Sequence, residues 1–225
     1  MPKATEEGME WDKWRLFFAD ERCVPLTDGD SNYRAWADAF LSSSGIPSEN
    51  VFAIDPSLAP EAAARDYLAK LAGVFSSGEI PGGKGGGGAG APPPPSFDAI
   101  LLGMGPDGHT CSLFPGHALL AEAGVWVAHI EDSPKPPPHR ITLTYPVLNN
   151  ARNVLFVANG ESKAALLPQF LRADPGGAGL VLVDASPYPA ARVQPTAPGG
   201  TLAWCVDAAA AAQCPAEVLE RALKS

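Results

Sequence analysis

Short apolar runs that alternate with helical stretches are the feature that most constrains this fold. The β-rich runs are Trp14–Ala19, Phe97–Met104, Val125–Ile130, Arg140–Tyr145, Val154–Ala158, Leu180–Val183 and Leu202–Val206. The stretches with helical spacing or composition are Tyr33–Leu41, Pro60–Phe75, Ser162–Arg172 and Asp207–Leu223. Continuous apolar strands separated by helices are typical of a sheet that is covered on both faces. The sequence therefore predicts an α/β fold with an open, mostly parallel sheet and helices on both faces.

One segment interrupts this alternation with glycine and proline. Residues Ser76–Ser96 read SSGEIPGGKGGGGAGAPPPPS, a composition that does not form a packed helix or strand. The part of the chain before this run contains only one convincing strand, which cannot form a sheet by itself. We therefore expect a disordered surface insert at about residues 76–96 within a single domain over residues 1–225, and not a linker between two domains.

Composition and charge exclude several classes of partner. The chain has 225 residues and a formal net charge of −9, which argues against a nucleic-acid or anionic-membrane surface. No apolar run approaches the ~20 residues of a membrane-spanning helix, and the stretch MPKATEEGMEWDKW lacks the apolar core of a signal peptide. The four cysteines are scattered without a C-x-x-C pair, which is typical of reduced thiols. We expect a soluble cytoplasmic protein that binds neither nucleic acid nor membrane.

The run Phe97–Met104 leads into a turn written G-x-G-x-x-G over residues 103–108. This pattern after a strand resembles a dinucleotide-binding loop, and Glu131 and Asp132 follow at a suitable distance for ribose contacts. However, such a loop leads directly into a helix that meets the pyrophosphate, and Pro115 leaves room for a short helix only. Pro106 also removes a backbone N–H from the loop. These two prolines disfavour a dinucleotide site.

The same turn also presents a histidine. Asp107 and His109 stand two residues apart at the carboxyl end of the predicted strand, where ligands collect in open α/β sheets. A carboxylate beside a histidine fixes its tautomer and keeps it competent as a general base. The spacing alone is equally compatible with a histidine that only caps the following turn, so the residues leave both interpretations open.

Several separated motifs resemble one enzyme family. They are FFADERCVPLTDGDSNY at residues 17–33, LLGMGPDGHTCSLFPGH at 101–117, DSPKPPPHRITLTYPVLNNAR at 132–152, LFVANGESKAALL at 155–167 and RVQPTAPGGTLAWCVDAAAA at 192–211. In this order they resemble the 6-phosphogluconolactonases, which belong to the same superfamily as the glucosamine-6-phosphate deaminases. The deaminases share the G-x-G-x-D-G-H turn but lack the PKPPP element, so the chain is more similar to the lactonases.

The resemblance implies hydrolysis of 6-phosphogluconolactone to 6-phosphogluconate in the oxidative pentose phosphate pathway, without a metal or organic cofactor. It implies that His109 is the general base that takes a proton from the attacking water. Asp107 would then orient His109, and the backbone N–H groups of the turn that contains Gly105 and Gly108 would steady the oxyanion.

Four cations are candidate partners for the substrate phosphate. Arg140 and Lys163 match positions in the family motifs, and Lys135 and Arg22 are further candidates. For Asp20 and Glu21, which end the first predicted strand, we expect a structural role.

One departure from the family concerns the start of the chain. The family normally begins with a further strand–helix unit whose Gly/Ser-rich turn wraps the phosphate, and nothing in this sequence matches it. We therefore expect an N-terminally truncated lactonase fold, in which loss of the loop weakens substrate binding. The alternative is a non-catalytic remnant of the family that binds a sugar phosphate or a partner.

Overall fold

The computed structural model describes residues 9–75, 93–173, 180–182 and 186–218. The chain forms two compact units, which are described separately below. The first contains residues 1–92 and 127–143, and the second contains residues 93–126 and 144–225. The predicted insert at about residues 76–96 lies outside the described residues as far as residue 92.

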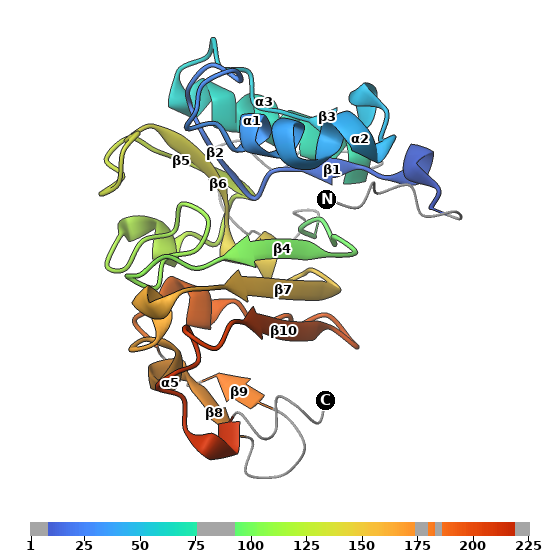
Figure 1. The fold of residues 1–225 in the computed structure, drawn as a ribbon. Coiled ribbons are helices and arrows are strands. Elements are labelled where there is room, and N and C mark those ends of the chain that lie inside the picture. The colour runs from blue at the N-terminus through green and yellow to red at the C-terminus, as the bar shows by residue number, and fades with distance from the viewer. Residues whose placement is uncertain (1–8, 76–92, 174–179, 183–185, 219–225) are drawn as a thin grey trace. The chain divides into compact units, whose positions relative to one another are not determined.

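The first unit contains two small sheets (Figure 1). β1 (Leu16–Phe17) pairs in parallel with β3 (Val51–Phe52). The other sheet is antiparallel, with the order β2 (Asp20–Arg22), β6 (Arg140–Leu143) and β5 (Val127–Ile130). Because Arg22 pairs directly with Arg140, this sheet brings together two cations that are far apart in the sequence.

A long helix packs on the strands β5 and β6 of the first unit. This helix, α3 (Pro60–Phe75), buries one side through Tyr67, Leu68 and Leu71, whose spacing matches the period of a helix. The buried Tyr67 hydroxyl donates to the Phe18 carbonyl oxygen at 3.1 Å. The remaining helical elements of this unit are Trp11–Lys13 (3-10), α1 (Asn32–Trp36), a π-type turn at Ala37–Leu41, α2 (Ser42–Ser44) and Ser48–Asn50 (3-10).

The second unit is built on a parallel three-stranded sheet in the order β10 (Thr201–Val206), β7 (Asn153–Ala158) and β4 (Ile100–Gly103) (Figure 1). The register sets Gly103 beside Val157 and Val206 beside Ala158, so all three carboxyl ends lie at one edge. An antiparallel pair, β8 (Leu171–Ala173) and β9 (Leu180–Leu182), and short helical elements complete the unit. The helical elements are Ala118–Ala121 (3-10), α4 (Tyr145–Leu148), Glu161–Lys163 (3-10), α5 (Leu167–Phe170) and Pro189–Arg192 (3-10).

The structure confirms the predicted α/β fold with parallel strands, and each predicted apolar run contains a strand. The prediction of a continuous helix over Ser162–Arg172 is wrong, because only α5 is α-helical there and β8 begins at Leu171. Pro168, which has no N–H to donate, stands in the first turn of α5 and starts a short new helix.

The predicted helix over Asp207–Leu223 is also wrong in its first half. Turns occupy residues 208–213, and an α-helix is assigned only at residues 216–218, directly after Pro215. The Asp207 carboxylate accepts the Ala210 N–H at 2.7 Å, which closes a tight turn in place of a helical start. The residues from 219 onwards lie outside the described part of the chain.

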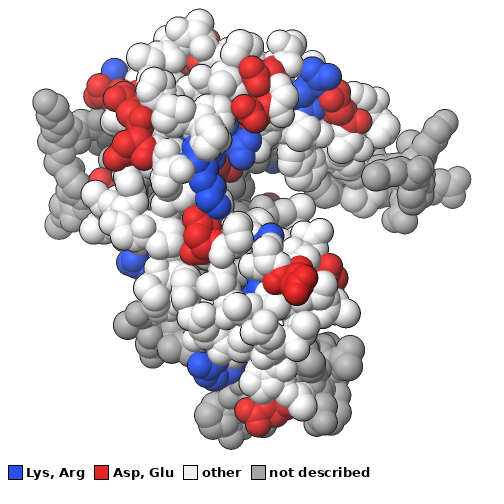
Figure 2. All heavy atoms as spheres, turned by 60° about the vertical axis from the view of Figure 1, so that its left-hand side comes forward, with Lys and Arg blue, Asp and Glu red and all other residues white. Residues whose placement is uncertain are grey.

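Charged side chains of both signs are interspersed on the face shown in Figure 2. This distribution fits a chain with 25 acidic and 16 basic residues, in which cations are the minority. Among the described helices, none combines the length and the apolar character that crossing a bilayer requires.

Candidate active site

The turn after β4 presents an aspartate and a histidine that contact each other directly. His109 Nδ1 lies 2.5 Å from Asp107 Oδ1, and their side chains are 18% and 38% exposed, respectively. When the carboxylate is ionised, Nδ1 carries the shared proton and the neutral ring keeps a lone pair on Nε2. The pair therefore has the arrangement of an oriented general base at the carboxyl edge of the β4–β7–β10 sheet.

Hydrogen bonds within the turn hold this pair in place. The Gly105 N–H donates to the His109 carbonyl oxygen at 2.9 Å, and the Gly108 N–H donates to the Gly105 carbonyl oxygen at 3.0 Å. Gly108 has a φ of +79°, a left-handed conformation that favours glycine. Because both N–H groups already donate inside the turn, an oxyanion contact would have to share these donors.

The absence of a side chain at Gly105 brings the His109 ring against the backbone. A Cβ at this position would lie 2.1 Å from both Nδ1 and Cε1 of His109, so the ring would have to move. We expect Gly105→Ala to lower kcat by roughly 100-fold while the protein still folds, because a small displacement of a catalytic group is enough for such a loss. Assays of the hydrolase activity that the sequence resemblance implies measure the first effect, and circular dichroism measures the second.

Gly103→Ala is the matched control for this substitution, because a Cβ at Gly103 meets no atom within 4 Å. This variant should keep wild-type activity. Equal activities of Gly105→Ala and Gly103→Ala would show that the close approach of the His109 ring to the backbone has no catalytic consequence.

Two aromatic residues support the turn and were not predicted from the sequence. The Phe114 ring lies 4.8 Å from the His109 ring, centroid to centroid, and Phe114 is buried. Tyr188 packs on Gly108, where a Cβ would lie 2.6 Å from Tyr188 Cδ1. The neighbouring Ala190 N–H donates to the Gly108 carbonyl oxygen at 3.0 Å. Phe114 lies within the motif at residues 101–117, which could have indicated it, whereas Tyr188 lies outside the motifs.

The geometry of the turn disfavours the dinucleotide interpretation. No α-helix follows β4 in the described residues up to the 3-10 turn at Ala118–Ala121. A pyrophosphate site of that type needs a helix N-terminus directly after the loop, together with unoccupied N–H groups. In this turn, Gly105 and Gly108 donate internally, and Pro106 has no N–H.

Lys163 lies at the same edge of the sheet as the histidine turn, in the 3-10 turn Glu161–Lys163 that follows β7. Its Nζ donates to Ser162 Oγ at 2.9 Å. The Gly160 N–H donates to both carboxylate oxygens of Asp207 at 3.1 Å, which fixes this loop to the residue that follows β10. These hydrogen bonds and the nearby Lys163 charge hold the pKa of Asp207 below its usual range, with the Ala210 N–H making the largest contribution.

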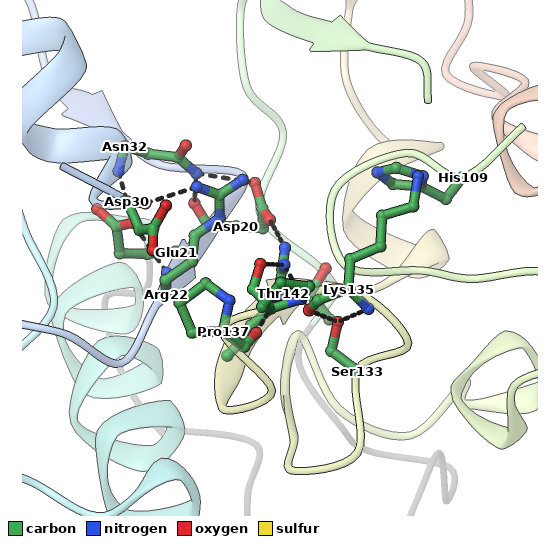
Figure 3. Close-up of polar contacts among 12 residues, drawn as sticks. Asp20, Glu21, Arg22, Asp30, Asn32, His109, Ser133, Lys135, Pro137 and Thr142 are labelled. Carbon is green, nitrogen blue, oxygen red and sulfur yellow. Dashed lines mark hydrogen bonds and ion pairs between the residues drawn. The ribbon is translucent and has the colours of Figure 1, made fainter. Parts of the chain in front are cut away.

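The other predicted cations lie in the first unit: Arg22 ends β2, Arg140 begins β6, and Lys135 lies in the loop between β5 and β6. Figure 3 labels Arg22 and Lys135. Arg22 Nη1 donates to the Asp30 carbonyl oxygen at 2.5 Å. Within the described residues, Arg22 Nε is buried without a hydrogen-bond partner, so the fold leaves donor capacity on this guanidinium unused. Burial and the neighbouring Arg22 charge lower the pKa of Arg140.

Arg140 and Lys135 are joined through the loop of consecutive prolines. Arg140 Nε donates to the Pro137 carbonyl oxygen, and Nη2 donates to those of Lys135 and Pro136, each at 2.9 Å. The peptide bond between Pro136 and Pro137 is cis. Arg140 Nη1 lies 4.0 Å from Asp20 Oδ2.

Glu21 has the structural role that the sequence predicts. Its buried carboxylate accepts the N–H groups of Asn32 and Tyr33 at 2.7 Å, the first residues of helix α1. It also accepts the Arg22 N–H at 2.8 Å and the Ser31 hydroxyl at 3.1 Å. Burial raises the pKa of Glu21, and these four hydrogen bonds oppose the rise.

The structure thus groups the predicted residues in two sets. Asp107, His109, Gly105 and Gly108 form one turn, with Lys163 at the same sheet edge, in the second unit. Arg22, Arg140 and Lys135 form the other set in the first unit. Within the described part of the chain, no group of three His, Cys, Asp or Glu residues has the arrangement of a metal site.

Comparisons with known proteins identify the family of the chain. The family model for glucosamine-6-phosphate isomerases/6-phosphogluconolactonase matches residues 1–204. The 6-phosphogluconolactonase of Rattus norvegicus is 46% identical over 213 residues, or 94% of this chain and 73% of the rat protein. The human 6-phosphogluconolactonase is 46% identical over 199 residues, or 88% of this chain and 67% of the human protein.

A solved structure agrees with this assignment. The crystal structure of 6-phosphogluconolactonase from Thermotoga maritima has a TM-score of 0.68 and 28% identity, over 88% of this chain and 74% of that chain. The family model spans residues of both compact units. The chain therefore belongs to the glucosamine-6-phosphate isomerase/6-phosphogluconolactonase family.

Proposed function

We infer that this chain is a lactonase that hydrolyses 6-phosphogluconolactone to 6-phosphogluconate in the pentose phosphate pathway. The observation that carries this inference is the contact of 2.5 Å between His109 Nδ1 and Asp107 Oδ1 on the turn after β4. Opening a lactone requires a base for water, and a carboxylate-oriented imidazole supplies one near neutral pH. The relatives named 6-phosphogluconolactonase at 46% identity support this substrate.

In the proposed reaction, His109 Nε2 takes a proton from water while the water oxygen bonds to the lactone carbonyl carbon. The tetrahedral oxyanion then collapses, the bond from the carbonyl carbon to the ring oxygen breaks, and His109 returns the proton to that oxygen. Asp107 stabilises the imidazolium that forms between the two steps. Backbone N–H groups of the turn at Gly105 and Gly108 are proposed to steady the oxyanion by sharing their present hydrogen bonds.

Cations are proposed to recognise the phosphate group of the substrate. We assign this role to Lys163, Lys135 and Arg22, and Arg140 belongs to the same substrate-binding set. The unused Nε donor of Arg22 supports its assignment, since a guanidinium binds phosphate through several parallel N–H groups. Lys163 adds a point charge at the edge of the sheet that carries His109.

We expect the full chain to consume 6-phosphogluconolactone faster than the spontaneous reaction, and 6-phosphogluconate to raise its melting temperature. A ligand that binds only the folded state at 100 times its Kd adds about 2.7 kcal/mol of stability. A thermal shift without turnover would indicate the non-catalytic sugar-phosphate binder instead. If millimolar 6-phosphogluconate gave no shift and the lactone decayed at its spontaneous rate, both functions would be excluded.

We further propose that residues 1–225 act as one lactonase-like domain, because one family model spans both units. A cytoplasmic location is also proposed, on the basis of the scattered cysteines without a C-x-x-C pair. Relatives from rice and Arabidopsis thaliana are named chloroplastic, so subcellular fractionation is the direct test.

A further inference from the structure

The Arg140 side chain is used mainly inside the protein. Its guanidinium donates to the carbonyl oxygens of three consecutive residues, Lys135, Pro136 and Pro137, each at 2.9 Å. The side chain is only 4% exposed, and its remaining nitrogen, Nη1, lies 4.0 Å from Asp20 Oδ2. A residue that recognised phosphate mainly through its own guanidinium would present more of that group to solvent.

The three carbonyl groups belong to a loop in which three consecutive residues, the prolines at 136–138, have no backbone N–H to donate. Local hydrogen bonds of the loop centre on Ser133: its N–H donates to the Pro138 carbonyl oxygen at 3.2 Å, its hydroxyl donates to the Lys135 carbonyl oxygen at 2.8 Å, and its Oγ accepts the Lys135 N–H at 3.3 Å. The Arg140 guanidinium therefore adds three hydrogen bonds that hold the carbonyl groups of residues 135–137.

We propose that Arg140 is a positioning residue, which holds the proline loop so that Lys135 meets the phosphate of the substrate. This inference deepens the proposed function, because it rests on the assignment of Lys135 as a phosphate contact. It reassigns the contribution of Arg140 from a direct contact to the placement of its neighbour. The planar guanidinium group suits this role, since its N–H groups point in fixed directions toward several acceptors at once.

Lysine cannot replace arginine in this role. An ammonium group at position 140 keeps the positive charge beside Asp20 but cannot reach three carbonyl oxygens in the geometry of the guanidinium. Arg140→Lys therefore separates the charge of the side chain from its function as a clamp. Arg152→Lys is the matched control, because Arg152 is an exposed residue whose guanidinium contacts the exposed carboxylate of Asp98.

The experiment is a double-mutant cycle on KM for 6-phosphogluconolactone. We expect Lys135→Met to raise KM about tenfold or more, the loss typical of a hydrogen bond between charged groups. Arg140→Lys should raise KM by a similar factor and change kcat little, because the phosphate lies away from the reacting carbonyl. The double variant should match Lys135→Met within about twofold, since the clamp has no further effect once the lysine is gone.

Hydrogen exchange supplies a readout that does not depend on the substrate. In Arg140→Lys, the amides of Ser133 and Lys135 should exchange faster, while the amides of helix α3 keep their wild-type protection. Arg152→Lys should leave both regions unchanged. If the amides of Ser133 and Lys135 exchanged at the wild-type rate in Arg140→Lys, the proposal that Arg140 holds the loop would be wrong.

The double-mutant cycle also tests the alternative that Arg140 contacts the substrate directly. If the KM effects of Arg140→Lys and Lys135→Met multiply in the double variant, Arg140 acts on the substrate independently and the proposal is wrong. If Lys135→Met leaves the KM of an active wild-type enzyme unchanged, the proposal fails but the hydrolase function stands. If the wild-type chain has no activity, the proposed function fails, while hydrogen exchange still reports whether Arg140 holds the loop.

Discussion

Replacing His109 with alanine should lower kcat/KM for lactone hydrolysis by roughly 100- to 10,000-fold, the range that a positioned general base contributes. The structure supplies the reason, because Asp107 Oδ1 lies 2.5 Å from Nδ1 and leaves Nε2 as the basic nitrogen of the neutral ring. The acid limb of the pH profile of kcat/KM reports the base of the free enzyme and should disappear in the variant. Initial rates above the spontaneous hydrolysis, measured across pH, provide both values.

His129→Ala is the matched control, because His129 is an exposed residue of β5 without a proposed role. It should retain wild-type kcat/KM and the wild-type pH profile. Asp107→Asn should cause a smaller loss than His109→Ala, since an amide oxygen still accepts the Nδ1 proton but no longer stabilises the imidazolium by charge. If His109→Ala kept both the rate and the acid limb, another group would have to be the base.

The turn that carries Asp107 and His109 could be predicted from the sequence because its features are local. An apolar run marked β4, glycines marked the turn, and the spacing of Asp107 and His109 placed the two side chains on one turn. Helix α3 was predicted with its observed bounds for the same reason, since its apolar residues recur with a helical period. Local pattern is sufficient where neighbours in sequence are also neighbours in space.

Features that depend on distant partners were not predicted. The strands β2 and β3 contain three and two residues, too few for an alternating pattern, and exist through their pairing with β6 and β1. The helix expected over Ser162–Arg172 is reduced to α5, and at its end Leu171 begins a strand that pairs with Leu182. The clamp of Arg140 on three carbonyl groups has no sequence signal, because backbone acceptors are the same in every residue.

Glu21→Ala should lower the free energy of unfolding by about 3 kcal/mol or more, because it leaves several buried donors without an acceptor. The carboxylate accepts the N–H groups of Arg22, Asn32 and Tyr33 and the hydroxyl of Ser31 at 2.7–3.1 Å. All four partners are donors, which suits a group that only accepts. Denaturant titration followed by circular dichroism measures the loss.

Glu21→Gln tests the charge of this group with little change in shape. The amide replaces one acceptor oxygen by a donor, so we expect a loss of about 2 kcal/mol at pH 7. Glu61→Gln, at an exposed residue paired with Arg65, is the matched control and should change stability by less than about 0.5 kcal/mol. Equal stabilities of the two glutamine variants would show that the Glu21 carboxylate does not hold the start of helix α1.

The pH dependence of stability provides a second test of Glu21. Burial raises the pKa of this carboxyl in the folded state above its ordinary value, so the folded protein binds the proton more tightly than the unfolded chain. The contribution of Glu21 to the free energy of unfolding is therefore fully present below the pKa that this carboxyl has in the unfolded chain. It decreases as the pH rises through the pKa of the carboxyl in the folded protein. Glu21→Gln removes this titration. The loss of stability of the variant relative to the wild type should therefore be larger at acidic pH than at pH 7. A loss that instead grew with rising pH would mean that the four hydrogen bonds outweigh burial and that the folded pKa is lowered.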